Sequence, residues 1–88
     1  MPKVDKDIQT FLERWLHKSV KKYVSHMDGR QDGGLHDLII SGVEKPLLEI
    51  VLQETEGNRT QAANILGINR NTLRKKIQDY NIQCRDRD

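Results

Sequence analysis

The chain has 88 residues, a formal net charge of +2, 35% hydrophobic residues and 32% charged residues, which favours one small folded domain over a disordered chain. A domain of this length buries only roughly 60–65% of its extended-chain surface, so we expect a partner chain to complete the core. One cysteine, Cys84, excludes an intrachain disulfide, and the lack of a signal peptide or of ~20 consecutive apolar residues makes a cytoplasmic protein the default expectation.

Residues 5–27 are predicted to form the first helix, because their apolar residues recur at steps of three, one and four positions. Acidic residues lie near the start of this segment and lysines lie late in it, as the helix dipole prefers. Residues 28–34 contain two Asp-Gly steps and three glycines, which predicts a loop between two helices.

Residues 35–56 are predicted to form a second, longer helix. Its main apolar stripe is widened by Ile40, Leu48 and Leu52, whereas a helix with one wet side needs only a single stripe. The wider apolar surface indicates burial against several neighbours, so we expect homodimerisation through the first two helices. The residues expected at the dimer interface are Phe11, Trp15, Ile40, Leu47, Leu48, Val51 and Leu52.

A proline, Pro46, lies inside the second predicted helix. Proline lacks the amide donor and crowds the carbonyl four residues earlier, which here belongs to Gly42. The helix must therefore break or kink at this point. Because the apolar stripe continues in phase from Val43 to Leu47, the pattern favours a kink within one helix.

Glycine and asparagine mark the ends of two further short helices. Gly57 can end the second helix and Asn58 can cap the third, which Gly67 then ends. Asn69 can cap a fourth helix that runs to about residue 80. The residues expected to face inward are Ala62, Ala63 and Leu66 in the third helix and Leu73, Ile77 and Tyr80 in the fourth.

Two short helices joined by a tight turn with a glycine are typical of a helix-turn-helix, whose second helix enters the DNA major groove. Residues 57–80 hold five Lys/Arg against one Asp/Glu, whereas residues 35–56 hold one against five. The positive charge therefore lies on the helix pair. Arg70 can pair with a guanine edge, and Lys75 and Lys76 suit flanking phosphates. By charge alone, these side chains could also form an ordinary solvated face.

The segment VEKPLLEIVLQETEGNRTQAANILGINRNTLRKKIQDYNI resembles the C-terminal part of the Fis family. That family includes the Fis nucleoid protein and the DNA-binding domains of NtrC-type transcriptional activators. The resemblance implies an all-α, four-helix fold that forms one structural domain. Residues 1–56, with the loop 28–34, would be the dimerisation helices, which intertwine with a second chain. Residues 57–82 would be the DNA-binding helix-turn-helix, and residues 83–88 a tail.

The resemblance also assigns DNA contacts. Asn71 stands where the Fis protein has glycine but fits the NtrC-type pattern, and its amide can reach base edges or phosphates. Gln61 stands where the Fis protein has arginine, at the position of a phosphate contact. The complete set of expected DNA-binding residues is Asn58, Thr60, Asn69, Arg70, Asn71, Thr72, Arg74, Lys75 and Lys76.

These features predict sequence- and shape-dependent binding of duplex DNA by a homodimer in bacterial transcription regulation. The RNTLRKKI motif and the NIQ ending favour the DNA-binding domain of an NtrC-type activator, with an ATPase domain upstream in the full-length protein. One alternative is a standalone Fis-like nucleoid protein that bends DNA, and a more distant one is a helical protein-interaction module.

We expect no enzymatic activity, because no nucleophile–base pair or phosphate-cradling loop is evident in the sequence. No metal and no cofactor are expected either, since the three histidines lack metal-ligand spacing with one another or with Cys84. The expected location is the cytoplasm, in association with the nucleoid.

Overall fold

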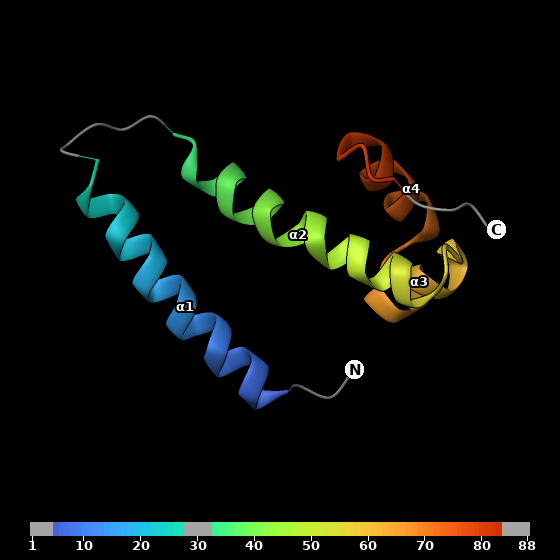
Figure 1. Cartoon of the computed structure of the whole chain (residues 1–88), viewed down its shortest axis with the longest axis horizontal. Coiled ribbons are helices and arrows are strands. Elements are labelled where there is room, and N and C mark those ends of the chain that lie inside the picture. The colour runs from blue at the N-terminus through green and yellow to red at the C-terminus, as the bar shows by residue number, and fades with distance from the viewer. Residues whose placement is uncertain (1–4, 28–32, 84–88) are drawn as a thin grey trace. The chain divides into compact units, whose positions relative to one another are not determined.

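The computed structural model describes residues 5–27 and 33–83 and contains four α-helices within those ranges (Figure 1). They are α1 (Lys6–Ser25), α2 (Leu35–Glu54), α3 (Arg59–Leu66) and α4 (Arg70–Asp79). The predicted all-α fold class with four helices is confirmed. The loop predicted over residues 28–34 falls mostly outside the described residues, as do Cys84 and most of the predicted tail. The chain divides into two compact units, Met1–Gly33 and Gly34–Asp88.

The first unit contains α1, which begins one residue later than predicted. Asp5 is its N-cap, and the Asp5 carboxylate accepts hydrogen bonds from the backbone N–H groups of Asp7 (3.0 Å) and Ile8 (3.1 Å). No residue of α1 is buried, and the side chains of Phe11 and Trp15 remain 66% and 42% exposed. A helix with such an apolar surface is stable only when another surface covers it.

The second unit contains α2, α3 and α4, which share one apolar core. Leu73 has no exposed surface, and Leu48 and Leu52 are each only 2% exposed. Leu48 and Leu52 were expected at the dimer interface, but within the single chain both side chains lie in the core shared with α3 and α4, where almost none of their surface is left for a second chain. The complete core cluster is Leu48, Leu52, Ala62, Ala63, Leu73, Ile77 and Ile82.

Helix α2 runs through Pro46 without a break (Figure 1). The alternative that the helix breaks at this proline is therefore wrong, and the kink favoured by the sequence stays a prediction. Because α2 is one helix, its exposed apolar side chains between residues 38 and 47 belong to the same element as the core residue Leu48. None of the described helices has the length and apolar character required to cross a membrane.

Helix α3 ends at Gly67, as predicted, in a turn that satisfies the last carbonyl groups of the helix. Gly67 has a φ of 74°, and its N–H donates to the carbonyl oxygens of Ala63 (2.8 Å) and Asn64 (3.3 Å). The N–H of Ile68 also donates to Ala63, at 3.1 Å. The bond from Ile68 to Ala63 and the bond from Gly67 to Asn64, around a left-handed residue, form the Schellman motif, in which glycine is favoured.

Helices α2 and α4 end in the same motif without glycine at the left-handed position. Glu56 and Asn81 each have a φ of 54° there. After α2, the N–H of Glu56 donates to Gln53 (3.1 Å) and that of Gly57 donates to Leu52 (2.8 Å). The expectation that Gly57 itself terminates α2 is therefore wrong by one residue, although Gly57 also has a positive φ of 83°.

Gly67→Ala is expected to lower the free energy of unfolding by about 1–2 kcal/mol, the cost of a left-handed backbone for a residue with a Cβ. No steric clash contributes, because a Cβ at Gly67 would meet no atom within 4 Å. Gly42→Ala is the matched control, since Gly42 is equally uncrowded but lies inside α2. The control should raise stability by about 0.5–1 kcal/mol. Urea denaturation measures the free energy of unfolding of both variants. If both substitutions change it in the same direction, this explanation is contradicted.

Candidate nucleic-acid interface

Both short helices begin with an asparagine cap, as predicted. The side-chain oxygen of Asn58 accepts a hydrogen bond from the backbone N–H of Gln61 at 3.0 Å. The side-chain oxygen of Asn69 accepts one from the backbone N–H of Asn71 at 2.7 Å. Because an amide oxygen can only accept hydrogen bonds, the group that each side chain can offer to a phosphate oxygen is its NH₂ donor.

Helix α4 is amphipathic. Its inner face carries Leu73 and Ile77, which are buried in the core. With 3.6 residues per turn, Asn71, Lys75 and Gln78 lie on the opposite side, and all three are exposed. Gln78 was not among the predicted site residues, although its spacing of seven positions from Asn71 and three from Lys75 places it on the same stripe.

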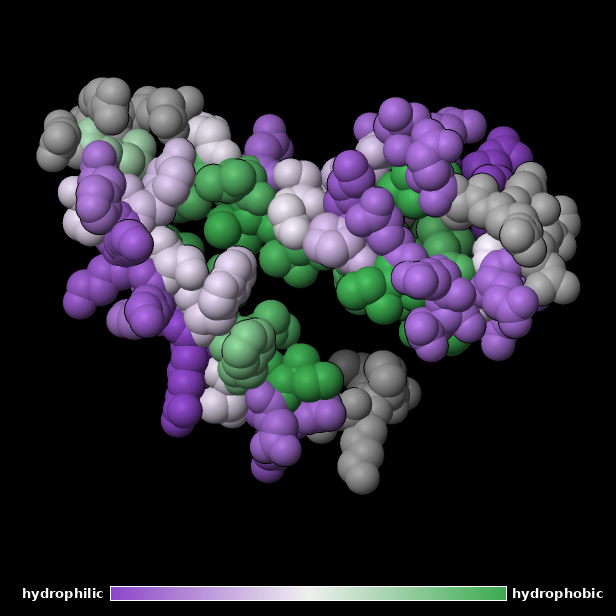
Figure 2. All heavy atoms as spheres, in the orientation of Figure 1, coloured by the Kyte–Doolittle hydropathy of each residue, from purple (hydrophilic) through white to green (hydrophobic). Residues whose placement is uncertain are grey.

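Most of the predicted DNA-binding residues are exposed to solvent. α3 and α4 pack on each other, and hydrophilic side chains cover much of the α3–α4 region in Figure 2. The structure thus places basic and amide side chains on the outside of a helix pair whose inside is the apolar core. Exposed members of the predicted set are Thr60, Asn69, Arg70, Asn71, Thr72, Arg74 and Lys75, whereas Asn58 is half-buried.

Lys76 differs from these residues, because it contacts α2. Its Nζ lies 3.1 Å from Oε1 of Glu44, and the hydroxyl of Tyr80 donates to the same oxygen at 2.6 Å. The hydroxyl and the ammonium hold the pKa of Glu44 below its ordinary value of 4.5, and the carboxylate raises the pKa of Tyr80 above 10.0. Glu44 is therefore ionised and Tyr80 protonated at neutral pH. Glu44 is half-buried.

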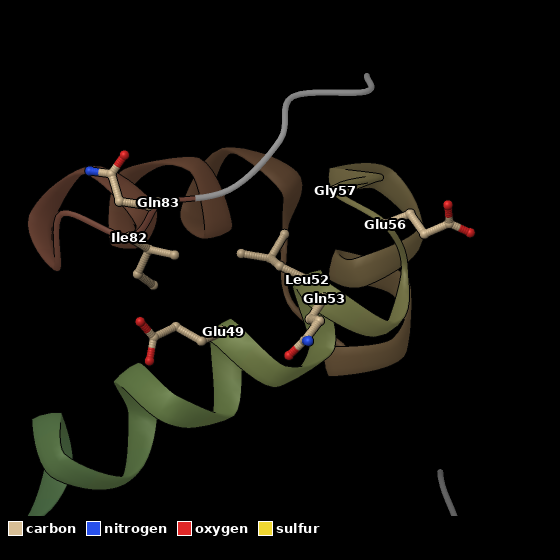
Figure 3. A pocket seen from close by; sticks show the side chains of 7 residues that line it. All are labelled: Glu49, Leu52, Gln53, Glu56, Gly57, Ile82 and Gln83. Carbon is tan, nitrogen blue, oxygen red and sulfur yellow. The ribbon is translucent and has the colours of Figure 1, made fainter.

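A groove of about 420 Å³ lies between α2 and the segment that follows α4 (Figure 3). Glu49 and Gln53 of α2 lie on one side of it and Ile82 and Gln83 on the other, and Glu56 adds a second carboxylate. Two carboxylates repel a polyanion, so this groove does not fit a phosphate backbone. Within residues 5–27 and 33–83, no group of three or more His, Cys, Asp or Glu residues could hold a metal ion.

Known proteins are similar to this chain in sequence over a region that includes α3 and α4. A family profile described as "Bacterial regulatory protein, Fis family" matches residues 40–80, which extend from α2 to the end of α4. The DNA-binding protein Fis of Buchnera aphidicola subsp. Acyrthosiphon pisum (strain 5A) is 45% identical over 78 residues, or 89% of this chain and 80% of that protein. The DNA-binding protein Fis of Aliivibrio fischeri (strain MJ11) is 42% identical over 76 residues, or 86% and 78% of the two chains. Each of these matches is longer than the second unit, residues 34–88, so each must include part of the first unit.

Proposed function

The chain belongs to the Fis family of bacterial regulatory proteins, and from this premise we propose that it binds duplex DNA as a homodimer through the helix-turn-helix formed by α3 and α4. The observation that carries the proposal is the amphipathic character of α4. Its apolar face is buried in the core, and its opposite face presents amide and basic side chains. Relatives named DNA-binding protein Fis support the same function.

In this proposal α4 is the recognition helix, which lies in the major groove. Arg70, Asn71 and Arg74 face the base edges, where arginine can recognise guanine and asparagine can recognise adenine. Thr60 and Lys75 contact phosphates on either side of the groove. The amide groups of the two asparagine caps, Asn58 and Asn69, and the N-terminal ends of α3 and α4 add donors for phosphate oxygens.

The homodimer is proposed because each unit leaves large apolar side chains exposed. On α1 these include Phe11 and Trp15, and on α2 they include Ile40 and Leu47. Val51, which is half-buried beside the core, extends the surface of α2. Complete burial of each such side chain contributes roughly 1.5–3 kcal/mol, so a second copy of the chain can supply the stability that one small core lacks.

A homodimer presents two copies of α4 to one duplex. The family resemblance implies that these two helices lie closer together than one turn of straight B-form DNA, so the bound DNA bends. Bending costs free energy that depends on the sequence between the two contact sites, so specificity comes partly from DNA shape. Contacts with phosphates then make a large contribution to affinity.

We favour a Fis-like nucleoid protein that bends DNA over the DNA-binding domain of an NtrC-type activator. The chain matches relatives named DNA-binding protein Fis over 80% of their length, and the match includes both units of this chain. The proposed role is in transcription regulation, and the proposed location is the nucleoid in the cytoplasm.

A titration of a fluorescently labelled duplex at several salt concentrations tests the proposed function. We expect saturable binding whose logarithmic affinity falls linearly with the logarithm of salt concentration, with a slope of about −0.9 for each phosphate contact. A helical module that binds only acidic proteins is the competing function. Absence of saturable duplex binding at low salt would favour that module.

A further inference from the structure

We propose that Lys76 is a positioning residue of the recognition helix rather than a phosphate contact. Together with Glu44 and Tyr80 it forms a group of side chains, called here the Glu44 cluster, that holds α4 in a defined orientation against α2. This inference rests on the proposed DNA binding, and it replaces the expectation that Lys76 contacts the DNA backbone.

The geometry of the Glu44 cluster links two helices that are far apart in the sequence. Lys76 and Tyr80 are four residues apart, within and just after α4, so both side chains lie on one side of that helix. Both donate to a single carboxylate oxygen of Glu44, at 3.1 and 2.6 Å, and Glu44 lies on α2. A carboxylate oxygen can accept two hydrogen bonds, so neither donor excludes the other.

Adjacent lysines of α4 occupy different environments. The side chain of Lys76 is only 32% exposed and that of its partner Glu44 only 26%, whereas Lys75 lies on the exposed face opposite Leu73. If Lys76 turned to a phosphate, the half-buried carboxylate of Glu44 would lose its cationic partner close to the DNA. Loss of one partner from a sheltered ion pair is unfavourable, so Lys76 is expected to stay with Glu44 when DNA binds.

The Glu44 cluster adds directional contacts to the apolar contacts of α4. Leu73 and Ile77 attach α4 to the core through contacts that have little directional preference. The two hydrogen bonds to Glu44 are directional and fix the rotation of α4 about its own axis. That rotation decides where Asn71 and Lys75 point. The lowered pKa of Glu44 and the raised pKa of Tyr80 agree with a hydrogen bond from a protonated hydroxyl to an ionised carboxylate.

The salt dependence of duplex binding tests this proposal with a matched pair of variants, Lys75→Met and Lys76→Met. Both remove one positive charge from neighbouring positions of α4. Lys75→Met should make the slope shallower by about 0.9, the value of one lost phosphate contact. Lys76→Met should weaken binding about three- to tenfold at every salt concentration and leave the slope unchanged. A slope that becomes shallower in Lys76→Met as much as in Lys75→Met would overturn the proposal.

Two further variants separate positioning from charge. Tyr80→Phe keeps every charge and the aromatic ring, so a loss of affinity without a change of slope supports positioning, and wild-type affinity contradicts it. Glu44→Gln should weaken binding although it removes a negative charge, whereas the control Glu49→Gln, at an exposed position of the same helix, should not. Tighter binding by Glu44→Gln would count against the cluster.

Stability measurements distinguish failure of this inference from failure of the proposed function. Urea denaturation of Glu44→Gln, Lys76→Met and the double variant shows whether the two residues are coupled, since contacting residues have non-additive effects. If the wild-type chain binds no duplex, the proposed function fails, while coupling still shows that the cluster joins α4 to α2. Additive effects would show that the cluster does not hold α4, whatever the chain binds.

Discussion

Leu47→Asp is expected to abolish the two-chain assembly and to weaken duplex binding by at least about 100-fold. Leu47 is 47% exposed in the single chain, so the core of the second unit does not require it. In the proposed homodimer the same side chain is buried, and an unpaired carboxylate in that position costs several kcal/mol. One copy of α4 makes only half of the DNA contacts of the dimer. A chain that cannot assemble is therefore expected to lose affinity for the duplex as well.

Sedimentation at low micromolar concentration measures the assembly, and titration of a labelled duplex measures the affinity. Ile65→Asp is the matched control for assembly, because Ile65 is an exposed apolar residue of α3 outside the proposed interface. The control should retain the two-chain mass. If Leu47→Asp also retains it, the proposed interface on α2 is wrong.

Arg70→Ala and Lys75→Ala are each expected to reduce duplex affinity by about 10- to 100-fold, but in different ways. Arg70 is proposed to recognise a base edge, so its loss costs about 1–3 kcal/mol and reduces discrimination between duplex sequences. Lys75 is proposed to contact a phosphate, so its loss weakens all duplexes alike and makes the salt slope shallower by about 0.9.

Binding to several labelled duplexes, each measured at several salt concentrations, separates the two effects. Lys45→Ala is the control, because it removes a positive charge from an exposed position of α2 outside the helix-turn-helix. The control should change affinity little. Wild-type affinity and wild-type salt slope in both test variants would exclude α4 as the recognition helix.

Local sequence signals predicted the ends of the short helices. Asn58, Gly67 and Asn69 act through bonds to residues no more than four positions away, so the sequence contains all that is needed. Glu56 was missed because a charged residue in a left-handed conformation has no sequence signature, and the neighbouring Gly57 is the more typical choice.

Long-range packing was less predictable. The apolar pattern of α2 shows which of its sides avoid water but not what covers each side, so Leu48 and Leu52 were assigned to a second chain although α3 and α4 bury them. The bond between Glu44 and Lys76 joins residues 32 positions apart and depends on how α4 lies against α2. A charge count of the fourth helix therefore could not separate Lys76 from Lys75.

In the proposed complex, two chains together present two recognition helices to one duplex. The most direct test is sedimentation of the wild-type chain mixed with a labelled duplex, with the protein and the label detected separately. We predict a complex that contains two chains per duplex at saturation and a two-chain mass for the protein alone. A saturated complex with one chain per duplex, or a protein that stays monomeric and leaves the duplex unbound, would contradict this proposal.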